Sequence, residues 1–149
     1  MFYKTTAELE KYVKDIYQRL QPMAEKDGIF LPISCYFAES TPLNQPGDYC
    51  FSGERGYHYC GIGDRGERFL NNVTSSIFEV SYWVIKFQVF LMASNYEHTH
   101  HICGRDFRRV MFAKALELFD ALGGNYRKRA EIDIDEILKE SPYDDVICG

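Results

Sequence analysis

The sequence has little of what secreted, membrane-spanning or zinc-binding proteins usually carry. Residues 1–6 contain no apolar segment of the kind found in signal peptides, so we expect a cytoplasmic protein. Five cysteines form no C-x-x-C pair, which favours reduced thiols over a zinc site or a disulfide framework. The longest apolar stretch, residues 77–93, is broken by Glu79 and Lys86 and is marginal for a membrane span, so we expect no membrane contact.

Basic charge and catalytic motifs are also scarce. The formal net charge is −5, so the total shows no basic footprint for a nucleic-acid partner. Neither G-x-S-x-G nor H-E-x-x-H occurs in the sequence. We therefore expect no nucleic-acid partner and no cofactor.

Aromatic residues, in contrast, are abundant. The chain of 149 residues contains 11 Phe, 11 Tyr and 1 Trp, and hydrophobic residues make up 46% of it. So many rings must lie in a core, in an interface or on a stacking platform. The length predicts one domain or at most two small ones, and we expect a single domain over residues 1–149 with a core of its own.

Apolar periodicity predicts four helices. Thr5 and Glu8 fit a capping box for a first helix over about 7–20, which Pro22 and Gly28 would end. A central buried helix is expected over about 74–97, with Thr74 as its cap. Two nearly opposite apolar stripes predict burial between two layers; they comprise Val80, Val84, Phe87 and Leu91, and Phe78, Tyr82, Ile85, Val89 and Met92.

Two further helices are expected in the last third of the chain. Asp106 can cap a helix that runs through Leu122, and Gly123-Gly124 would end it. A fourth helix is expected over about 126–139, with its inward side chains at Ile134, Ile137 and Leu138.

The strands are expected in the first half. Residues 29–37 suggest an edge strand, and the ranges 49–52, 57–62 and 67–73 suggest an antiparallel meander. The sequence Gly-Glu-Arg-Gly at 53–56 returns as Gly-Asp-Arg-Gly at 63–66, and each suggests a three-residue hairpin loop. That loop length sets Phe51 opposite Tyr59 and gathers one aromatic face from Tyr49, Phe51, Tyr57, Tyr59 and Phe69. The fold class is α+β: a short antiparallel β meander packed against about four α-helices.

A charged constellation surrounds the junction between the second and third predicted helices. It comprises Glu97, Arg105, Asp106, Arg108 and Arg109. Arginines in a first helical turn oppose the helix dipole, so we expect Arg–carboxylate pairs to compensate them. The network either fixes this helix corner or contacts a partner.

Charge is segregated at the end of the chain. Residues 104–130 carry seven Lys/Arg against three Asp/Glu, and residues 131–145 carry seven Asp/Glu against one Lys. The candidate acidic face consists of Glu131, Asp133, Asp135, Glu136 and Glu140. It is either a solvated helix face or a surface for a basic partner.

Three histidines and a thiol form the pattern His98-x-His100-His101-x-Cys103. These are ligand types that zinc prefers. Structural zinc sites usually draw ligands from separate elements, whereas this cluster lies in one connector. Incidental surface histidines are therefore the first interpretation, and a metal site is the alternative.

In the order and spacing of several motifs, the chain resembles the Immunity protein 63 family of bacterial polymorphic toxin systems. The similarity starts at about residue 48. The motifs include the aromatic hairpins with their Arg-Gly turn, Phe78-Glu79-Val80-Ser81-Tyr82-Trp83-Val84, Tyr96-Glu97, Asp106-Phe107-Arg108-Arg109, Phe112, Leu116-Glu117-Leu118, Glu136-Ile137-Leu138, and Pro142-Tyr143-Asp144-Asp145. The resemblance implies a cytoplasmic protein that binds and neutralises a cognate toxin, without catalysis.

The leading hypothesis is therefore a non-enzymatic bacterial immunity protein whose partner is a cognate protein toxin. Two alternatives remain at this point. One is a small metal-binding protein or enzyme that uses His98, His100, His101 and Cys103. The other is a homo-oligomeric structural subunit whose excess aromatic residues form the interface.

Overall fold

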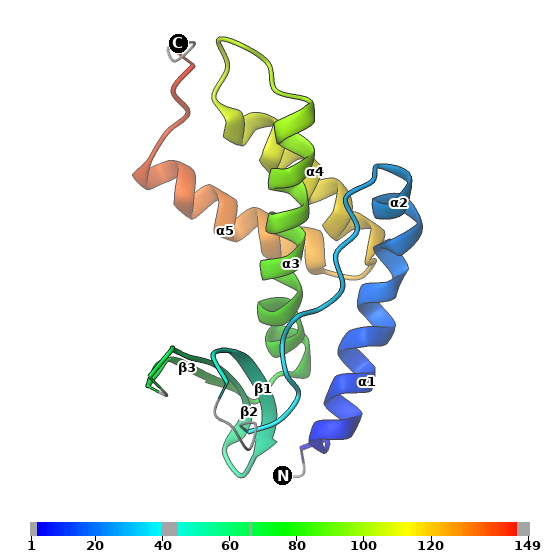
Figure 1. Cartoon of the computed structure of the whole chain (residues 1–149), viewed down its shortest axis with the longest axis vertical. Coiled ribbons are helices and arrows are strands. Elements are labelled where there is room, and N and C mark those ends of the chain that lie inside the picture. Colours follow the sequence, from blue (N-terminus) through cyan, green and yellow to red (C-terminus); the bar gives the residue numbers. More distant parts are fainter. Residues whose placement is uncertain (1–2, 40–44, 66, 146–149) are drawn as a thin grey trace. The chain divides into compact units, whose positions relative to one another are not determined.

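The computed structural model describes residues 3–39, 45–65 and 67–145 (Figure 1). The contacts divide the chain into two compact units. Unit 1 comprises Met1–Ile16 and Pro32–Ile85, and unit 2 comprises Tyr17–Leu31 and Lys86–Gly149. The single domain expected from the chain length stays a prediction.

The described residues form an α+β fold with a central helix, as the sequence predicts. The elements in chain order are α1 (Thr6–Tyr17), a short 3-10 helix η1 (Gln18–Leu20), α2 (Gln21–Lys26), β1 (Gly47–Gly53), β2 (Gly56–Ile62), β3 (Arg68–Thr74), α3 (Ile77–Thr99), α4 (Phe107–Ala121) and α5 (Tyr126–Glu140). Within the described residues, the strands form one antiparallel sheet of order β1-β2-β3.

The first helical segment begins where its capping box predicts. The Thr5 amide donates to Glu8 Oε1 at 3.0 Å, and the Glu8 amide donates to Thr5 Oγ1 at 3.1 Å. The expected exit at Pro22 is wrong, because Pro22 lies in the first turn of α2. A proline in that position removes no helical hydrogen bond, so η1 and α2 continue the chain after α1.

The register of the first hairpin differs by one residue from the expected one. Phe51 pairs with His58 rather than with Tyr59, and Gly53 pairs with Gly56 around a two-residue loop. Residues opposite one another share a face, so Phe51 and Tyr59 lie on different faces. One buried cluster contains Tyr49, Phe51, Cys60 and Ile62.

Both faces of the sheet nevertheless bury aromatic rings. Tyr57 and Tyr59 are buried on the face opposite Phe51. The Tyr57 ring meets Tyr3 edge to face at 5.4 Å, and Tyr59 Oη donates to Asp48 Oδ2 at 2.7 Å. The expectation of a single aromatic face is therefore wrong. The side chain of Phe69 and the second predicted turn residue, Gly66, lie outside the part of the structure that is described.

Gly56 explains the shorter loop. Its φ is +133°, and a Cβ built on it would lie 2.5 Å from the backbone oxygen of Thr74. Gly56 is thus paired within β2 beside β3, and is not the left-handed residue that closes a three-residue loop. The absence of a side chain allows β3 to end close to this strand.

Residues 29–37 do not form the expected edge strand. Within this range the structure shows a single bridge, between Tyr36 and Tyr49. The Tyr36 amide donates to Asp48 O at 2.9 Å, and Tyr36 O accepts from the Cys50 amide at 2.8 Å. Pro32 has no amide hydrogen to donate to a ladder, which is consistent with pairing at only one point.

Helix α3 is apolar around most of its circumference, but its burial changes along its length. Val80 and Val84 are buried, whereas Phe87 and Leu91 of the same stripe are 52% and 42% exposed. The expected burial between two layers is therefore confirmed for the first stripe only at Val80 and Val84. The second stripe is buried at Tyr82, Ile85, Val89 and Met92.

By length and composition alone, α3 could also cross a membrane. Half of its most apolar window is buried within the protein. This is weak support for a membrane span, because the core helix of a soluble protein has the same properties.

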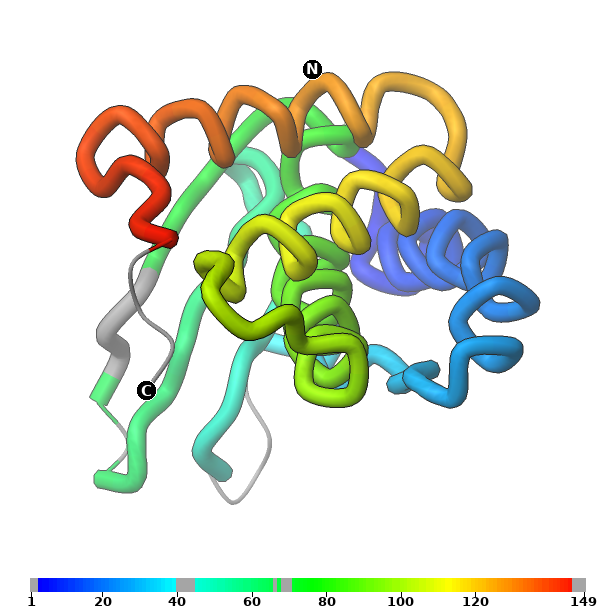
Figure 2. The backbone as a smooth tube through the Cα atoms, turned by 90° about the horizontal axis from the view of Figure 1, so that it is seen from above, coloured from blue at the N-terminus to red at the C-terminus, as the bar shows by residue number. Residues whose placement is uncertain are grey.

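Helices α4 and α5 run side by side as a helical hairpin within unit 2 (Figure 2). Asp106 caps α4, and Gly123 and Gly124, with φ of +79° and +58°, follow it, as the sequence predicts. On α5, Ile134 is buried, but Ile137 is 41% exposed and does not lie in the core as expected.

We expect Gly56→Ala to lower the free energy of unfolding by about 2–3 kcal/mol, because the new methyl group meets backbone atoms at a strained φ. Gly53→Ala is the matched control, since its Cβ meets the His58 side chain at 3.0 Å and comes no closer than 3.8 Å to a backbone atom, Gly56 O. We expect this control to cost under about 1 kcal/mol. Urea unfolding measures both, and equal losses would contradict the close approach of Thr74.

Candidate functional site

Asp106 holds the N-terminus of α4. Its Oδ1 accepts from the Arg108 amide at 2.9 Å, which satisfies one of the unpaired donors of the first turn. The same carboxylate pairs with the Arg108 guanidinium, with 2.8 Å between Oδ2 and Nη2. Oδ2 also accepts from the Asp144 amide at 2.9 Å. One side chain thus joins the start of α4 to the segment after α5.

Arg108 and Arg109 extend this connection. Arg108 donates from Nη1 to the carbonyl of Ser141 at 2.8 Å and from Nη2 to that of Pro142 at 3.0 Å. Arg109 makes a bidentate pair with Asp145, with Nε–Oδ1 and Nη2–Oδ2 both 2.9 Å. We call this network the tail clamp; with the ring described next, it comprises Asp106, Arg108, Arg109, Tyr143 and Asp145.

The Tyr143 ring lies against both arginines. The guanidinium carbon of Arg109 is 4.1 Å from the ring centroid, and that of Arg108 is 5.6 Å away. The face of an aromatic ring attracts cations, so Tyr143 stabilises the charges that the carboxylates pair. The ring also packs against Phe112, with 6.4 Å between their centroids.

The electrostatics of the tail clamp favour the charged forms. The hydrogen bond from the Arg108 side chain holds the pKa of Asp106 well below its usual range, although burial acts in the opposite direction. The hydrogen bond from Arg109 likewise lowers the pKa of Asp145. Both carboxylates therefore stay ionised at neutral pH.

The structure does not bring all five residues of the predicted constellation together. Arg108 and Arg109 join Asp106, but Glu97 pairs with His101, with 2.5 Å between Oε2 and Nδ1. Arg105 is exposed, and its backbone amide donates to Ile102 O. The compensating carboxylate for Arg109 is Asp145, which the sequence reasoning missed.

The acidic residues of α5 differ in what they contact. Asp133 pairs with Arg129 at 2.8 Å and with Lys86 of α3 at 3.2 Å. Glu131 and Arg127 form a longer pair of 3.9 Å, in which both side chains are about half exposed. Asp135 is exposed.

Glu136 and Glu140 line a shallow depression of about 280 Å³. Its other lining residues are Lys86, Asp133 and Ile137. We call Asp133, Glu136, Ile137 and Glu140 the acidic flank of α5. Its charge is partly neutralised at Asp133, and the two glutamates form no ion pair among the described residues.

The histidine-rich connector does not gather into a metal site. His100 Nδ1 lies 2.9 Å from Tyr96 O, and its ring stacks on Tyr96 at 3.8 Å. His101 is engaged by Glu97, and His98 is exposed. Across residues 3–39, 45–65 and 67–145, no group of three or more potential ligands is placed to hold a metal ion. Cys103 is disulfide-bonded, so the expectation of reduced thiols is wrong at this position.

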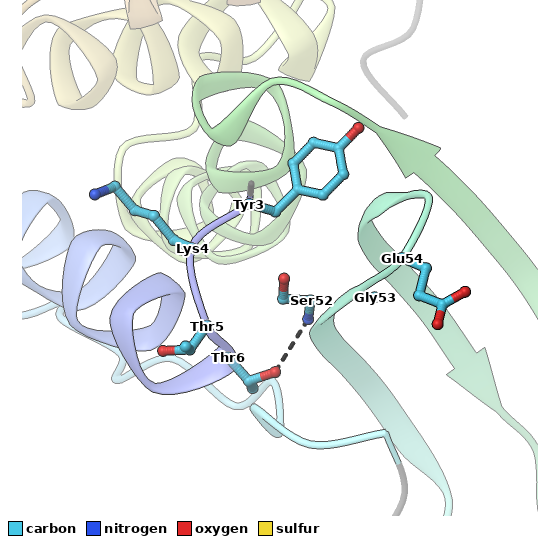
Figure 3. Close-up of a pocket in the computed structure, with 7 residues that line it drawn as sticks. All are labelled: Tyr3, Lys4, Thr5, Thr6, Ser52, Gly53 and Glu54. Atoms are coloured by element: carbon cyan, nitrogen blue, oxygen red, sulfur yellow. Dashed lines mark hydrogen bonds between the residues drawn. The ribbon is translucent and has the colours of Figure 1, made fainter. Parts of the chain in front are cut away.

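Unit 1 has an open depression of about 610 Å³ at the start of α1 (Figure 3). It is lined by Tyr3, Lys4, Thr5, Thr6, Ser52, Gly53 and Glu54. Most of its polar groups serve the fold. Thr6 Oγ1 accepts from the Ser52 amide at 3.1 Å, and the Lys4 amide donates to Tyr57 Oη at 2.9 Å. The side chains of Lys4 and Glu54 point away from one another (Figure 3), so no catalytic pair forms there.

Sequence reasoning also missed the ion pair of Lys114. This side chain is 5% exposed and contacts Asp27, Glu117 at 3.3 Å, and the Tyr96 ring at 4.5 Å. Burial by itself lowers the pKa of the ammonium group, but the hydrogen bonds to the two carboxylates outweigh it and raise the pKa. Glu117 is found at helical spacing i+3, whereas no sequence signal connects Lys114 with Asp27.

The family comparison matches this chain to the model of Immunity protein 63 over residues 53–136. The match covers more than half of the chain and extends from the β1–β2 turn into α5. The chain belongs to the Immunity protein 63 family. Membership indicates a toxin-neutralising function, and immunity proteins are generally not enzymes. The comparisons with curated proteins and with solved structures gave no match.

We expect Asp106→Ala to lower the free energy of unfolding by about 3 kcal/mol, because the cap and the charge-assisted hydrogen bonds are lost together. Asp106→Asn keeps the cap and should lose about half as much. Asp120→Ala, an exposed position on the same helix, serves as the control and should stay within about 0.5 kcal/mol. Urea unfolding measures all three, and a small loss for Asp106→Ala would contradict the role of the clamp.

The stability contributed by Asp106 should depend on pH. Since its pKa is depressed in the folded state, the contribution is complete above the unfolded pKa of about 3.9 and is lost as pH falls through the folded value. The stability gap between the unaltered chain and Asp106→Asn should therefore be constant from pH 7 to about 5 and narrow below about 4. A gap that stays constant at pH 3 would show that ionisation of Asp106 contributes nothing.

Proposed function

We propose that this protein binds a cognate protein toxin in the bacterial cytoplasm and neutralises it by covering a surface that the toxin needs. The observation that carries the proposal is the family match over residues 53–136. The action is stoichiometric and requires no cofactor. The tail clamp and the ion pairs of Lys114 fit this proposal, because their charged groups are held by contacts that stabilise the fold.

The tail clamp contributes to this function by shaping the protein, not by contacting the toxin. The carboxylate of Asp106 and the guanidinium groups of Arg108 and Arg109 are committed to partners within the chain. To contact another molecule, these groups would first have to break their charge-assisted hydrogen bonds. That free-energy cost is higher than the cost of using an exposed, unpaired charge for the same contact. Arg105, which is exposed, is the member of the predicted network that is positioned for partner contact.

We assign the toxin contact to the acidic face of α5, at Glu131, Asp133, Asp135, Glu136 and Glu140. In its acidic flank, Glu136 and Glu140 form no ion pair with another described residue, and the exposed Ile137 lines the same depression. This chemistry fits a basic surface with an apolar anchor. Complementary charge raises the association rate and the selectivity, while buried apolar groups supply most of the affinity.

The test is co-expression with the product of the adjacent gene, scored for survival and for a purified complex. We expect rescue of growth and a one-to-one complex with the full chain. Unaltered killing together with no complex would overturn the proposed function. Binding kinetics on the purified pair would then locate the contact.

We expect Glu136→Lys to slow association with that gene product by about tenfold at low salt and to make the rate less sensitive to salt. Asp120→Lys is the matched control, because it makes the same change in net charge at an exposed position on α4. Surface plasmon resonance measures both rates. Equal association rates for the two variants would show that the acidic flank does not contact the toxin, and would not contradict toxin binding itself.

A further inference from the structure

The disulfide at Cys103 sets this residue apart from the other described cysteines. Cys35, Cys50 and Cys60 carry free thiols, whereas Cys103 is bonded. The sequence contains five cysteines, and the fifth is Cys148, which lies outside the described residues. Within one chain, this count leaves Cys148 as the remaining partner for Cys103.

The tail clamp joins the two segments of the chain that carry these cysteines. The Asp106 amide donates to Asp145 Oδ1 at 2.8 Å, and Arg109 pairs with the same carboxylate at 2.9 Å. Cys103 is found three residues before Asp106, and Cys148 is found three residues after Asp145. Three residues span at most about 11 Å of chain, so both cysteines are tethered near this contact. The described residues after α5 lie beside the connector that precedes α4 (Figure 1).

We propose that Cys103 and Cys148 form a reversible disulfide that locks the tail clamp when the surroundings are oxidising. The bond closes a loop that contains the whole α4–α5 hairpin, whose two open ends the clamp already joins. A cross-link over such a loop removes conformations from the unfolded chain, and so stabilises the folded hairpin. Under reducing conditions, the ion pairs and hydrogen bonds of the clamp hold the tail without it.

The reagent that forms the bond is a low-molecular-weight disulfide such as oxidised glutathione. Cys103 is exposed, so its thiolate can attack one sulfur of that disulfide and release the first glutathione as a thiolate. The thiolate of Cys148 then attacks the Cys103 sulfur of the mixed disulfide and releases the second glutathione. The two cysteines give up two protons, which the two glutathione thiolates take up, and two electrons pass from the cysteines to glutathione.

The position of Cys103 fits a reversible lock better than a structural cross-link. An exposed disulfide is open to attack by reductants, and exposed disulfides are typically the labile or regulatory ones. Cys50 and Cys60 are buried but free, so the core around them is built without a disulfide. The cytoplasm keeps most thiols reduced, so the form held by the clamp alone is the resting form there. The inference concerns the chain without a toxin, and it does not rest on the proposed function.

The first measurement maps the bond on the full chain. The purified protein is incubated with excess oxidised glutathione and digested with trypsin without a reductant. Trypsin releases Cys103 in peptide 87–105 and Cys148 in peptide 140–149. We expect these peptides as one cross-linked species, which dithiothreitol separates into two. A bond from Cys103 to a different cysteine, or two separate peptides before reduction, would overturn the proposal.

Thermal unfolding of the full chain measures the effect of the lock. Oxidation should raise the midpoint by about 10 °C, because the cross-link closes a loop of about 45 residues in the unfolded chain. Cys103→Ser and Cys148→Ser should each unfold like the reduced chain, with or without oxidised glutathione. Cys35→Ser is the matched control, since it replaces a free and partly exposed thiol, and it should keep the whole shift. Equal midpoints for the oxidised and reduced forms of the unaltered chain would show that the bond locks nothing.

The clamp should in turn favour the bond, because coupling between two contacts is reciprocal. Asp145→Asn weakens the pair with Arg109, so the equilibrium constant for forming the disulfide from oxidised glutathione should fall about tenfold. Asp120→Asn is the matched control on an exposed carboxylate of α4, and it should leave the constant unchanged within about twofold. Titration in glutathione buffers, with the free thiols counted by alkylation, measures both constants. If the two variants gave the same constant, the bond would be independent of the clamp and the proposal would fail.

Discussion

The burial of α3 is the constraint on which both units depend. Its residues up to Ile85 belong to unit 1, and those from Lys86 belong to unit 2. A helix that contributes to two cores needs apolar residues around most of its circumference. It therefore lacks the usual contrast between a polar, solvent-exposed face and an apolar, buried face. Polar residues buried with it must be satisfied, as Ser81 is by its hydrogen bond to Phe78 O at 2.6 Å. The change at Phe87 and Leu91, from buried to exposed, marks where one stripe leaves the core.

The helices could be predicted from the sequence because their signals are local, whereas the strand pairing could not. Thr5 and Glu8, three residues apart, hydrogen-bond one another at the start of α1, and Asp106 accepts from the amide of Arg108, two residues further on. The predicted register of the first hairpin was wrong because it placed all the rings on one buried face of the sheet. Burial on both faces removes that assumption, since Phe51 and Tyr59 can then lie on opposite sides. The short loop depends on Gly56 and the oxygen of Thr74, a contact that spacing within one hairpin does not reveal.

In the charged site, too, the local contacts could be predicted from the sequence and the tertiary contacts could not. Pairing of Asp106 with Arg108 follows from their spacing and from the cap. Asp145 and Tyr143 are more than thirty residues away from the arginines that they contact, and only the packing of α4 with α5 brings them close. Glu97 was assigned to the arginines by sequence proximity, although its spacing of four residues from His101 within or near one helix also predicts the contact that forms. Tertiary packing therefore decided the carboxylate of Arg109, whereas local spacing decided that of Arg108.

The two charged regions should act differently because their charges are paired to different extents. In the tail clamp the charges are paired inside the chain, so they stabilise a shape and offer little to a partner. On α5, Asp133 forms ion pairs with both Lys86 and Arg129. Glu136 and Glu140 are exposed to solvent and form no ion pair with another described residue. Exposed charges of this kind attract an oppositely charged partner but contribute little affinity once it is bound. Affinity must then come from desolvated apolar contact, for which Ile137 lies in the acidic flank and Ile132 is 55% exposed on the same helix.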